Sequence, residues 1–328
     1  MGLRREAAEF QTIPSRIFAC YTKAVYHFAM KAFRKRDPAA KAVQIEKGTT
    51  STVKYQLFIG QEIYFVRVYP FYYGRTVRVM FDTVKQLAEQ GCDVPPPISI
   101  IRRFPFVYHT EPWINGTTLK ESLGMLAGDK QYEAGLAVSS ALKRFREARI
   151  THPLEPLMDR LRRTINTFRQ SPHSLFGLKE KFLSYIVSFF PVLEKRPQVL
   201  LHGDLHLKNI MLAAEHQPLF IDFGLICMGD PLYDVICLLE RNEGYKWFNR
   251  GVLDGLGVEL TLYDWRIMGC YYVIRKIGEY LQCIQSLPEH LASREGWEER
   301  YVLLTDPNAM RAAVLFEEHP EDEWARGS

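Results

Sequence analysis

A set of polar residues with the spacing of a phosphoryl-transfer site lies between Val199 and Asp234. His202-Gly203-Asp204 is followed five residues after the Asp by Asn209, and Asp222-Phe223-Gly224 begins thirteen residues after that Asn. Phosphoryl transfer needs a carboxylate that accepts the proton of the attacking hydroxyl and hard oxygen ligands that hold Mg²⁺ against the phosphates. We therefore predict Asp204 as the catalytic carboxylate, with Asn209 and Asp222 as the metal ligands.

Two short apolar runs, Val199 to Leu201 and Leu219 to Ile221, lead into these groups. They are too short for helices and are bounded by turn formers, which favours buried strands. Each strand would bring its polar residues to a fixed edge. The alternative is a pair of buried strands with Asp-Gly turns and no chemistry. It would require all of these residues to fall at this spacing by chance, so we do not favour it.

The order of a loop Asp, an Asn and an Asp-Phe-Gly is typical of the eukaryotic-like kinase fold. The sequence HGDLHLKN, followed by IDFGLICMGDPLYD, resembles the aminoglycoside phosphotransferase and choline kinase superfamily, which phosphorylates hydroxyls of small molecules. The Gly-Asp-Pro-x-x-Asp tail, Gly229 to Asp234, favours this superfamily over protein kinases, and no Ala-Pro-Glu sequence follows Asp222. We expect His202, Asp230 and Asp234 to hold the catalytic loop by hydrogen bonds.

The resemblance implies an α+β, bilobal protein-kinase-like fold, with a small N-terminal lobe built on an antiparallel sheet, a larger, mainly helical C-terminal lobe and the nucleotide between them. We expect four segments. They are an N-terminal helical extension (1–40), a nucleotide-binding sheet (41–112), a lobe with the catalytic and substrate-binding elements (113–316) and an acidic tail (317–328).

Period-two alternation from Ala42 to Tyr69, broken at Gly48 and at Gly60-Gln61, predicts three antiparallel strands. The first break holds Gly48, Thr49, Thr50, Ser51 and Thr52, whose hydroxyl and N–H groups could bind phosphate oxygens. Without the downstream motif, an ordinary hairpin turn would be the preferred interpretation. Arg67 in the third strand stands where the resemblance implies contact with the α- and β-phosphates, and a surface Arg is the alternative.

A helix over about residues 76–89 follows, and Asp82 is the carboxylate within it. We expect Asp82 to form an ion pair with Arg67. Strands at 98–102 and 106–110 lead into Glu111-Pro112-Trp113-Ile114, which resembles the hinge whose backbone binds the adenine edge. Because Pro112 has no N–H, the donor must be Trp113 or Ile114.

Helical periodicity covers most of the remaining chain, at 119–126, 132–148, 155–168, 179–193, 235–242 and 265–284. The resemblance places the acceptor against the C-terminal helices, where Glu240, Glu243 and Asp264 could contact a cationic acceptor or could be helix-end charges. An amphipathic helix at 13–36 ends in a basic cluster. We expect it to pack on its own domain, with a membrane surface or a partner as alternatives.

The composition is that of an ordinary globular protein of 328 residues, with 47% hydrophobic residues and a net charge of +4, which gives no case for nucleic acid as a partner. The part after Asp234 has 16 acidic and 10 basic residues, a net of −6, which leaves +10 for residues 1–234. Six scattered cysteines without a CxxC pair, no apolar signal core and no membrane span favour a cytoplasmic protein. The sequence does not indicate an oligomeric state.

The sequence therefore predicts an enzyme that uses ATP (or GTP) and Mg²⁺ to phosphorylate a hydroxyl of a small molecule, aminoglycoside- or choline-like or a sugar. An atypical Ser/Thr protein kinase that acts on a partner protein is an alternative. A pseudokinase that binds nucleotide without catalysis is another, but Asp204, Asn209 and Asp222 are all present. The acceptor itself is not specified by the sequence.

Overall fold

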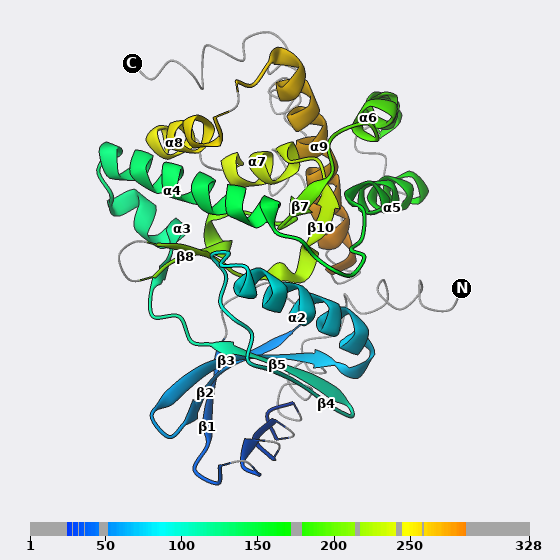
Figure 1. Cartoon of the computed structure of the whole chain (residues 1–328). Coiled ribbons are helices and arrows are strands. Elements are labelled where there is room, and N and C mark those ends of the chain that lie inside the picture. Colours follow the sequence, from blue (N-terminus) through cyan, green and yellow to red (C-terminus); the bar gives the residue numbers. More distant parts are fainter. Residues whose placement is uncertain are drawn as a thin grey trace, which may run out of the picture. The chain divides into compact units, whose positions relative to one another are not determined.

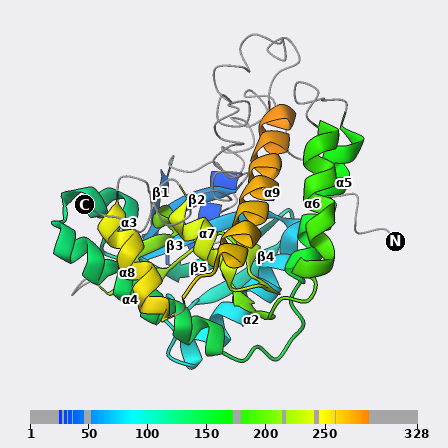
Figure 2. The ribbon, with the colours of Figure 1, turned by 90° about the horizontal axis from the view of Figure 1, so that it is seen from above.

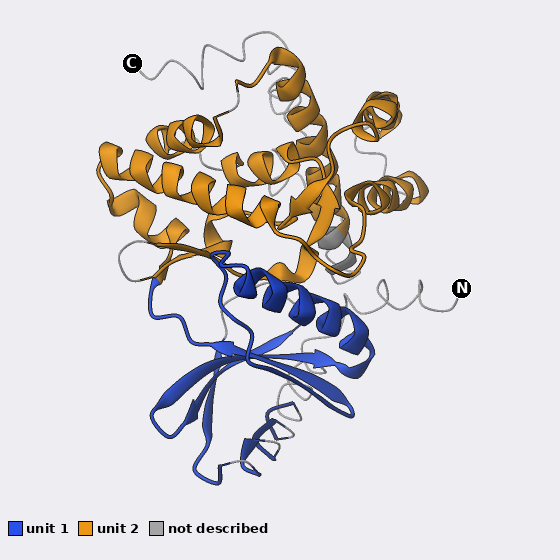
Figure 3. Cartoon of the chain, in the orientation of Figure 1, with its two compact units in different colours: residues 1–116 blue, residues 117–328 orange. Residues whose placement is uncertain are grey.

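The structure is a computed structural model that describes residues 25–27, 29–31, 33–35, 37–45, 52–171, 179–213, 217–240, 245–257 and 259–286. The chain divides into two compact units, unit 1 at Met1–Gly116 and unit 2 at Thr117–Ser328 (Figure 3). Among the described residues, no helix combines the length and the apolar character that crossing a membrane requires.

Unit 1 is built on a five-stranded sheet with the order β1-β2-β3-β5-β4, in which all neighbours are antiparallel (Figure 1). The strands are β1 (Lys41–Ile45), β2 (Val53–Ile59), β3 (Glu62–Pro70), β4 (Ser99–Arg103) and β5 (Phe106–Pro112). The alternation of apolar and polar residues thus predicted both the three-stranded meander and the two later strands.

One face of this sheet carries the hydrophobic core of unit 1. Tyr55, Val66 and Tyr108 lie in it, together with Val25 and Phe33 from the helical residues that precede β1. The Phe33 and Tyr108 rings meet edge-on with centroids 5.8 Å apart. The described part of the segment 13–36 therefore packs on its own unit, as expected.

The opposite face of the sheet carries α2 (Gly74–Glu89), which follows a 3₁₀ turn, η1 (Phe71–Tyr73). Val77, Met80, Val84 and Leu87 form the buried stripe of α2, at helical spacing. The centroids of the Phe81 and His109 rings lie 5.8 Å apart, with the rings nearly perpendicular. Since successive strand residues point to opposite faces, His109 lies on the α2 side and Tyr108 on the core side.

Unit 2 is mainly helical. Its helices are α3 (Leu119–Ser122), α4 (Gly128–Glu147), α5 (Leu157–Gln170), α6 (Lys179–Leu193), α7 (Leu232–Leu239), α8 (Lys246–Leu256) and α9 (Leu262–Ser286), and a 3₁₀ turn, η2 (Leu123–Met125), follows α3. Figures 1 and 2 show α5 and α6 side by side, next to the long α9. Helix α8 was not predicted. It packs so closely on α4 that a Cβ on Gly251 would lie 2.2 Å from the Tyr132 carbonyl oxygen.

Two small sheets in unit 2 fix the loops between its helices. β7 (Val199–Leu201) pairs antiparallel with β10 (Cys227–Gly229), and β6 (Thr117–Thr118), β8 (Ile210–Leu212) and β9 (Pro218–Phe220) form a sheet in the order β6-β8-β9. The predicted strands at 199–201 and 219–221 are β7 and β9. β8 and β10 were not predicted. Each has three residues, too few to show a period, and neither is an apolar run that leads into the predicted catalytic residues as β7 and β9 do.

The described cysteines are small buried residues, as predicted. Cys92, Cys227, Cys237 and Cys270 are buried and free of disulfides. Burial raises the pKa of Cys227 and that of Cys270 to about 12, so both thiols stay protonated at neutral pH.

Candidate active site

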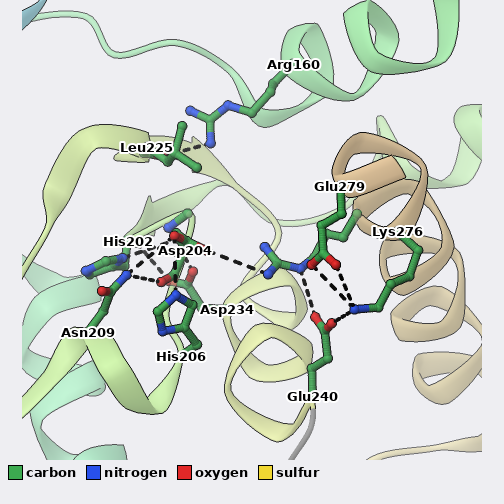
Figure 4. A network of polar contacts seen from close by, with 12 residues as sticks. Arg160, His202, Asp204, His206, Asn209, Leu225, Asp234, Glu240, Lys276 and Glu279 are labelled. Atoms are coloured by element: carbon green, nitrogen blue, oxygen red, sulfur yellow. Dashed lines mark hydrogen bonds and ion pairs between the residues drawn. The ribbon is translucent and has the colours of Figure 1, made fainter. Parts of the chain in front are cut away.

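The loop that carries Asp204 leaves β7 and is held by Asp234, at the start of α7. The backbone N–H of His202 donates to Asp234 Oδ2 at 2.8 Å, and that of Gly203 donates to Oδ1 at 2.9 Å. Asp234 is fully buried. Both of its oxygens are thus used to fix the two residues before Asp204, as the sequence predicted (Figure 4).

Gly203 is required where this loop turns. Its φ is +78°, a left-handed conformation, and a Cβ there would lie 1.9 Å from the Leu225 carbonyl oxygen. Arg160 donates to that same carbonyl at 2.8 Å. The loop with Asp204 and the turn after Asp222 therefore lie against each other.

His202 joins the two loops. Its Nε2 donates to the Ile221 carbonyl at 2.8 Å, while its Nδ1 accepts from the Asp204 N–H at 3.4 Å. One ring nitrogen therefore donates and the other accepts, and the two bonds connect the loop of Asp204 with the residue that follows β9. The ring is buried, with its centroid 5.0 Å from that of Phe223. His202 has the structural role that the sequence predicted.

Asn209 lies beside Asp204. Its Nδ2 donates to the Asp204 carbonyl at 2.9 Å and lies 3.4 Å from Asp204 Oδ2. Its backbone carbonyl accepts from the Ile221 N–H at 2.9 Å, so the residue before Asp222 is held by both Asn209 and His202. Asp222 itself has a left-handed backbone, with φ 67° and ψ 66°. The three residues predicted to do the chemistry thus belong to two connected loops of unit 2.

The side-chain oxygens of Asn209 and Asp222 are suitable ligands for a magnesium ion. Because the Asn209 amide nitrogen is used on Asp204, its amide oxygen is the atom that could bind a cation. Within the described ranges, no group of three or more His, Cys, Asp or Glu residues could hold a metal ion. Mg²⁺ in nucleotide sites needs only one or two protein oxygens because phosphates and water complete its shell, so a carboxylate and an amide suffice.

Two side chains near Asp204, those of His206 and Arg275, were not predicted. His206 Nε2 lies 3.6 Å from Asp204 Oδ2, and Arg275 Nη2 lies 3.6 Å from Oδ1. Burial lowers the pKa of His206, an effect that the Asp204 carboxylate partly offsets. His206 could have been suspected, since it stands two residues after Asp204. Arg275 comes from α9, and nothing in the sequence connects it to the loop.

Asp230 does not hold the catalytic loop, which corrects the prediction. This buried carboxylate accepts from Arg196 Nε at 2.7 Å, from the Leu232 N–H at 3.0 Å and from the Tyr271 hydroxyl at 3.1 Å. It therefore connects the start of α7 to α9. In the Gly-Asp-Pro-x-x-Asp sequence only the second Asp, Asp234, bonds to the loop.

In unit 1, Arg67 is buried on β3, and its guanidinium lies 5.3 Å from the centroid of the Phe65 ring. The expected ion pair with Asp82 is not formed. Asp82 lies 4.0 Å from Arg78, one turn away on α2, and its side chain is 45% exposed. Arg67 pairs with His109 of the neighbouring strand β5. The buried Glu111 is two residues after His109 and therefore lies on the same face of the sheet. Burial lowers the pKa of His109, an effect that Glu111 offsets and Arg67 reinforces.

The segment predicted as a hinge begins within β5. Glu111 pairs with Phe65, and the Trp113 N–H donates to the Ile63 carbonyl at 3.3 Å. This bond leaves Ile114 as the better of the two predicted adenine donors. Of the turn predicted to cover the phosphates, Thr52 is a half-buried bend residue. Gly48, Thr49, Thr50 and Ser51 lie outside the described residues.

The acids named for a cationic acceptor are used within the protein. Glu240 forms ion pairs with Arg275, at 3.2 Å, and with Lys276. Asp264 lies 3.3 Å from Arg196 and accepts from the Thr261 N–H at 3.1 Å, so it is a helix-end charge at the start of α9. Glu243 lies outside the described residues.

The fold and this loop arrangement define a protein-kinase-like phosphotransferase. The sequence profile of the phosphotransferase enzyme family matches residues 41–271. The chain belongs to this family, and it is an enzyme that transfers a phosphoryl group to a hydroxyl of a small molecule. No curated protein sequence matches the chain.

Solved structures of antibiotic kinases share this fold. The chain is similar to the ADP-bound aminoglycoside phosphotransferase APH(2'')-Ib, with 16% identity, TM-score 0.63 and coverage of 87% of this chain and 97% of that one. It is similar to the amicoumacin kinase hAmiN in complex with AMP-PNP, Ca²⁺ and Ami, with 12% identity, TM-score 0.61 and coverage of 86% and 88%. The spectinomycin phosphotransferase APH(9)-Ia, in complex with ADP and spectinomycin, gives 16% identity, TM-score 0.56 and coverage of 85% and 93%.

Proposed function

We propose that the chain transfers the γ-phosphoryl group of ATP, or of GTP, to a hydroxyl of a small molecule in a reaction that needs Mg²⁺. The observation that carries this proposal is the connection of three residues. Asn209 bonds to Asp204 through its amide, and its backbone holds Ile221, the residue before Asp222. A proton acceptor and two hard oxygen ligands on such connected loops are what this chemistry requires.

In unit 2, Asp204 orients the acceptor hydroxyl and accepts its proton. Asn209 and Asp222 would hold Mg²⁺, which when bound neutralises charge on the phosphates. Because the transition state of this transfer is loose, most of the rate comes from position and charge. The buried His202 and Asp234 are therefore functional through the loop that they hold.

In unit 1, Arg67 contacts the α- and β-phosphates, and the Ile114 N–H donates to the base. We keep Gly48 to Thr52 as the proposed ligands of the phosphates. We assign to Glu111 the task first given to Asp82, that of balancing and orienting the Arg67 guanidinium. Glu111 is buried on the same sheet face, whereas Asp82 is exposed and paired with Arg78.

The acceptor is a small molecule rather than a protein. Between Asp222 and α7 the chain forms only a 3₁₀ turn, Phe223–Leu225, and β10, which leaves no long segment of the kind that protein kinases use to bind a peptide. The related structures hold ADP, AMP-PNP and antibiotics. Aminoglycoside, choline-like amine and sugar all remain candidates here.

Loss of the metal ligand tests the proposal. ATP should raise the melting temperature of the wild type when Mg²⁺ is present, since a ligand at 100 times its Kd stabilises the fold by ~2.7 kcal/mol. Asp222→Ala should remove most of the Mg²⁺-dependent part of this shift without changing the melting temperature of the free protein greatly. An equal Mg²⁺-dependent shift of the melting temperature in both proteins would show that Asp222 is not a metal ligand. A panel of alcohols, screened for ADP release, would then identify the acceptor.

A further inference from the structure

We propose that Arg275, held by Glu240, is a positioning residue for Asp204. This inference rests on the proposed function, because it concerns how the catalytic carboxylate of that reaction is held. No motif in the sequence points to Arg275. It stands on α9, outside the loop sequences that define the site.

The guanidinium of Arg275 lies between two carboxylates. Its Nη2 is 3.6 Å from Asp204 Oδ1, and its Nε is 3.2 Å from Glu240 Oε2. Its carbon Cζ lies 5.7 Å from the centroid of the Tyr233 ring, a cation–π contact. The Arg275 side chain is 12% exposed and that of Glu240 is 5% exposed. The guanidinium therefore has little freedom to move.

The neighbouring charges explain why Arg275 stays at this place. Glu240 at the end of α7 also pairs with Lys276, and Lys276 lies 3.2 Å from Glu279 (Figure 4). A buried Arg is costly unless it is paired, and here Glu240 supplies the partner. The pair of Lys276 with Glu279 completes the charge balance on α9. Glu240 thus anchors Arg275 while leaving one side of the guanidinium directed at Asp204.

The contacts of Asp204 are divided between its two oxygens. Oδ2 faces Asn209 and His206, at 3.4 and 3.6 Å, and Oδ1 faces Arg275 at 3.6 Å. A separation of 3.6 Å is longer than a hydrogen bond. Arg275 therefore acts on the position of the Asp204 carboxylate by its charge rather than by a hydrogen bond, and the lone pairs of Oδ1 remain available to an acceptor hydroxyl.

A Lys could not replace Arg275 fully. The planar guanidinium contacts Asp204 and Glu240 through different nitrogens in a rigid arrangement, whereas an ammonium is a single point charge. Arg250 offers the matched control. It is also an arginine paired with a carboxylate, since its Nε lies 2.8 Å from Asp254 Oδ2, but this pair lies on the surface of α8.

The test compares Arg275→Gln, Arg275→Lys and Glu240→Gln with the control Arg250→Gln. The measurement is transfer from γ-³²P-ATP to whichever alcohol of the panel the wild type phosphorylates fastest. We expect Arg275→Gln to lower kcat by about 10²-fold, as for a small displacement of a catalytic group. Arg275→Lys should recover part of this loss. The KM for ATP should stay within about twofold, and Arg250→Gln should keep the wild-type kcat.

A second measurement separates positioning from folding. Circular dichroism melting identifies any variant that is unfolded at the assay temperature, and Arg275→Lys preserves the charge if Arg275→Gln fails to fold. A kcat near the wild-type value in folded Arg275→Gln, or in folded Arg275→Lys if only that variant folds, would overturn the inference and leave the proposed function intact. An equal loss in Arg250→Gln would also overturn it. A wild type that phosphorylates no alcohol would overturn the proposed function, and this inference with it.

Discussion

At the scale of single residues, buried groups hold the loops that carry the predicted catalytic residues. Asp234 accepts two backbone N–H groups from the loop of Asp204, and His202 connects this loop to the strand end before Asp222. These bonds are made in a buried environment, where an unmade hydrogen bond is expensive. The geometry of the catalytic residues is thus set by their buried neighbours.

Asp234→Asn should damage both activity and stability. Asn keeps the size of the side chain but presents an amide N–H₂ to one of two donors, so at least one loop bond is lost. We expect kcat to fall by about 10²-fold and the free energy of unfolding to fall by about 2 kcal/mol, the contribution of a hydrogen bond to a charged group. Steady-state kinetics and urea unfolding measure the two effects.

Asp254→Asn is the control, since Asp254 pairs with Arg250 one turn away on the surface of α8. Such pairs contribute about 0–1 kcal/mol. Wild-type kcat in folded Asp234→Asn would show that the loop keeps its conformation without these bonds.

The sequence predicts the residues whose relation is local in the chain. Asp204, Asn209 and Asp222 lie within a short stretch, and the structure places them on connected loops. Arg275 could not be predicted because its contact with Asp204 joins two distant segments. The expected ion pair of Asp82 with Arg67 did not take helical phase into account. Met80 and Val84 lie on the buried stripe of α2, and Asp82 falls between them and pairs with Arg78.

At the scale of elements, period-two alternation predicted the sheet of unit 1 and helical periodicity predicted most of unit 2. The elements that were missed are short or rich in glycine. Helix α8 carries Gly251 and Gly255, which lower helix propensity but allow close contact with α4. Packing against α4 decided the conformation of that segment, and packing is not visible in a single sequence.

The sheet of unit 1 makes a testable prediction about Arg67. If Glu111 orients Arg67, then Glu111→Gln should raise the KM for ATP severalfold. Asp82→Asn should leave it unchanged and alter stability by no more than about 0.5 kcal/mol, as for an exposed helical pair. Initial-rate kinetics at varied ATP measure this difference. A larger effect of Asp82→Asn than of Glu111→Gln would restore Asp82 as the partner.

At the scale of the whole molecule, each unit supplies a different part of the proposed chemistry. Unit 1 provides a sheet with a buried Arg67, and unit 2 provides the loops with Asp204, Asn209 and Asp222. The family match extends over both, from residue 41 to residue 271. Composition and net charge gave no case for nucleic acid as a partner and did not indicate the acceptor. The acids expected to bind a cationic acceptor proved to be paired internally, at least for Glu240 and Asp264.

The central claim is that Asp204 serves phosphoryl transfer from a magnesium-bound nucleotide to an alcohol. The most direct measurement is mass-spectrometric detection of the phosphate monoester formed from ATP, Mg²⁺ and the best alcohol of the panel, by wild type and by Asp204→Asn. We predict steady product formation by the wild type and loss of at least about 10³-fold in the variant, with equal affinity of both for Mg²⁺-ATP. Product formation by Asp204→Asn at the wild-type rate would contradict the account.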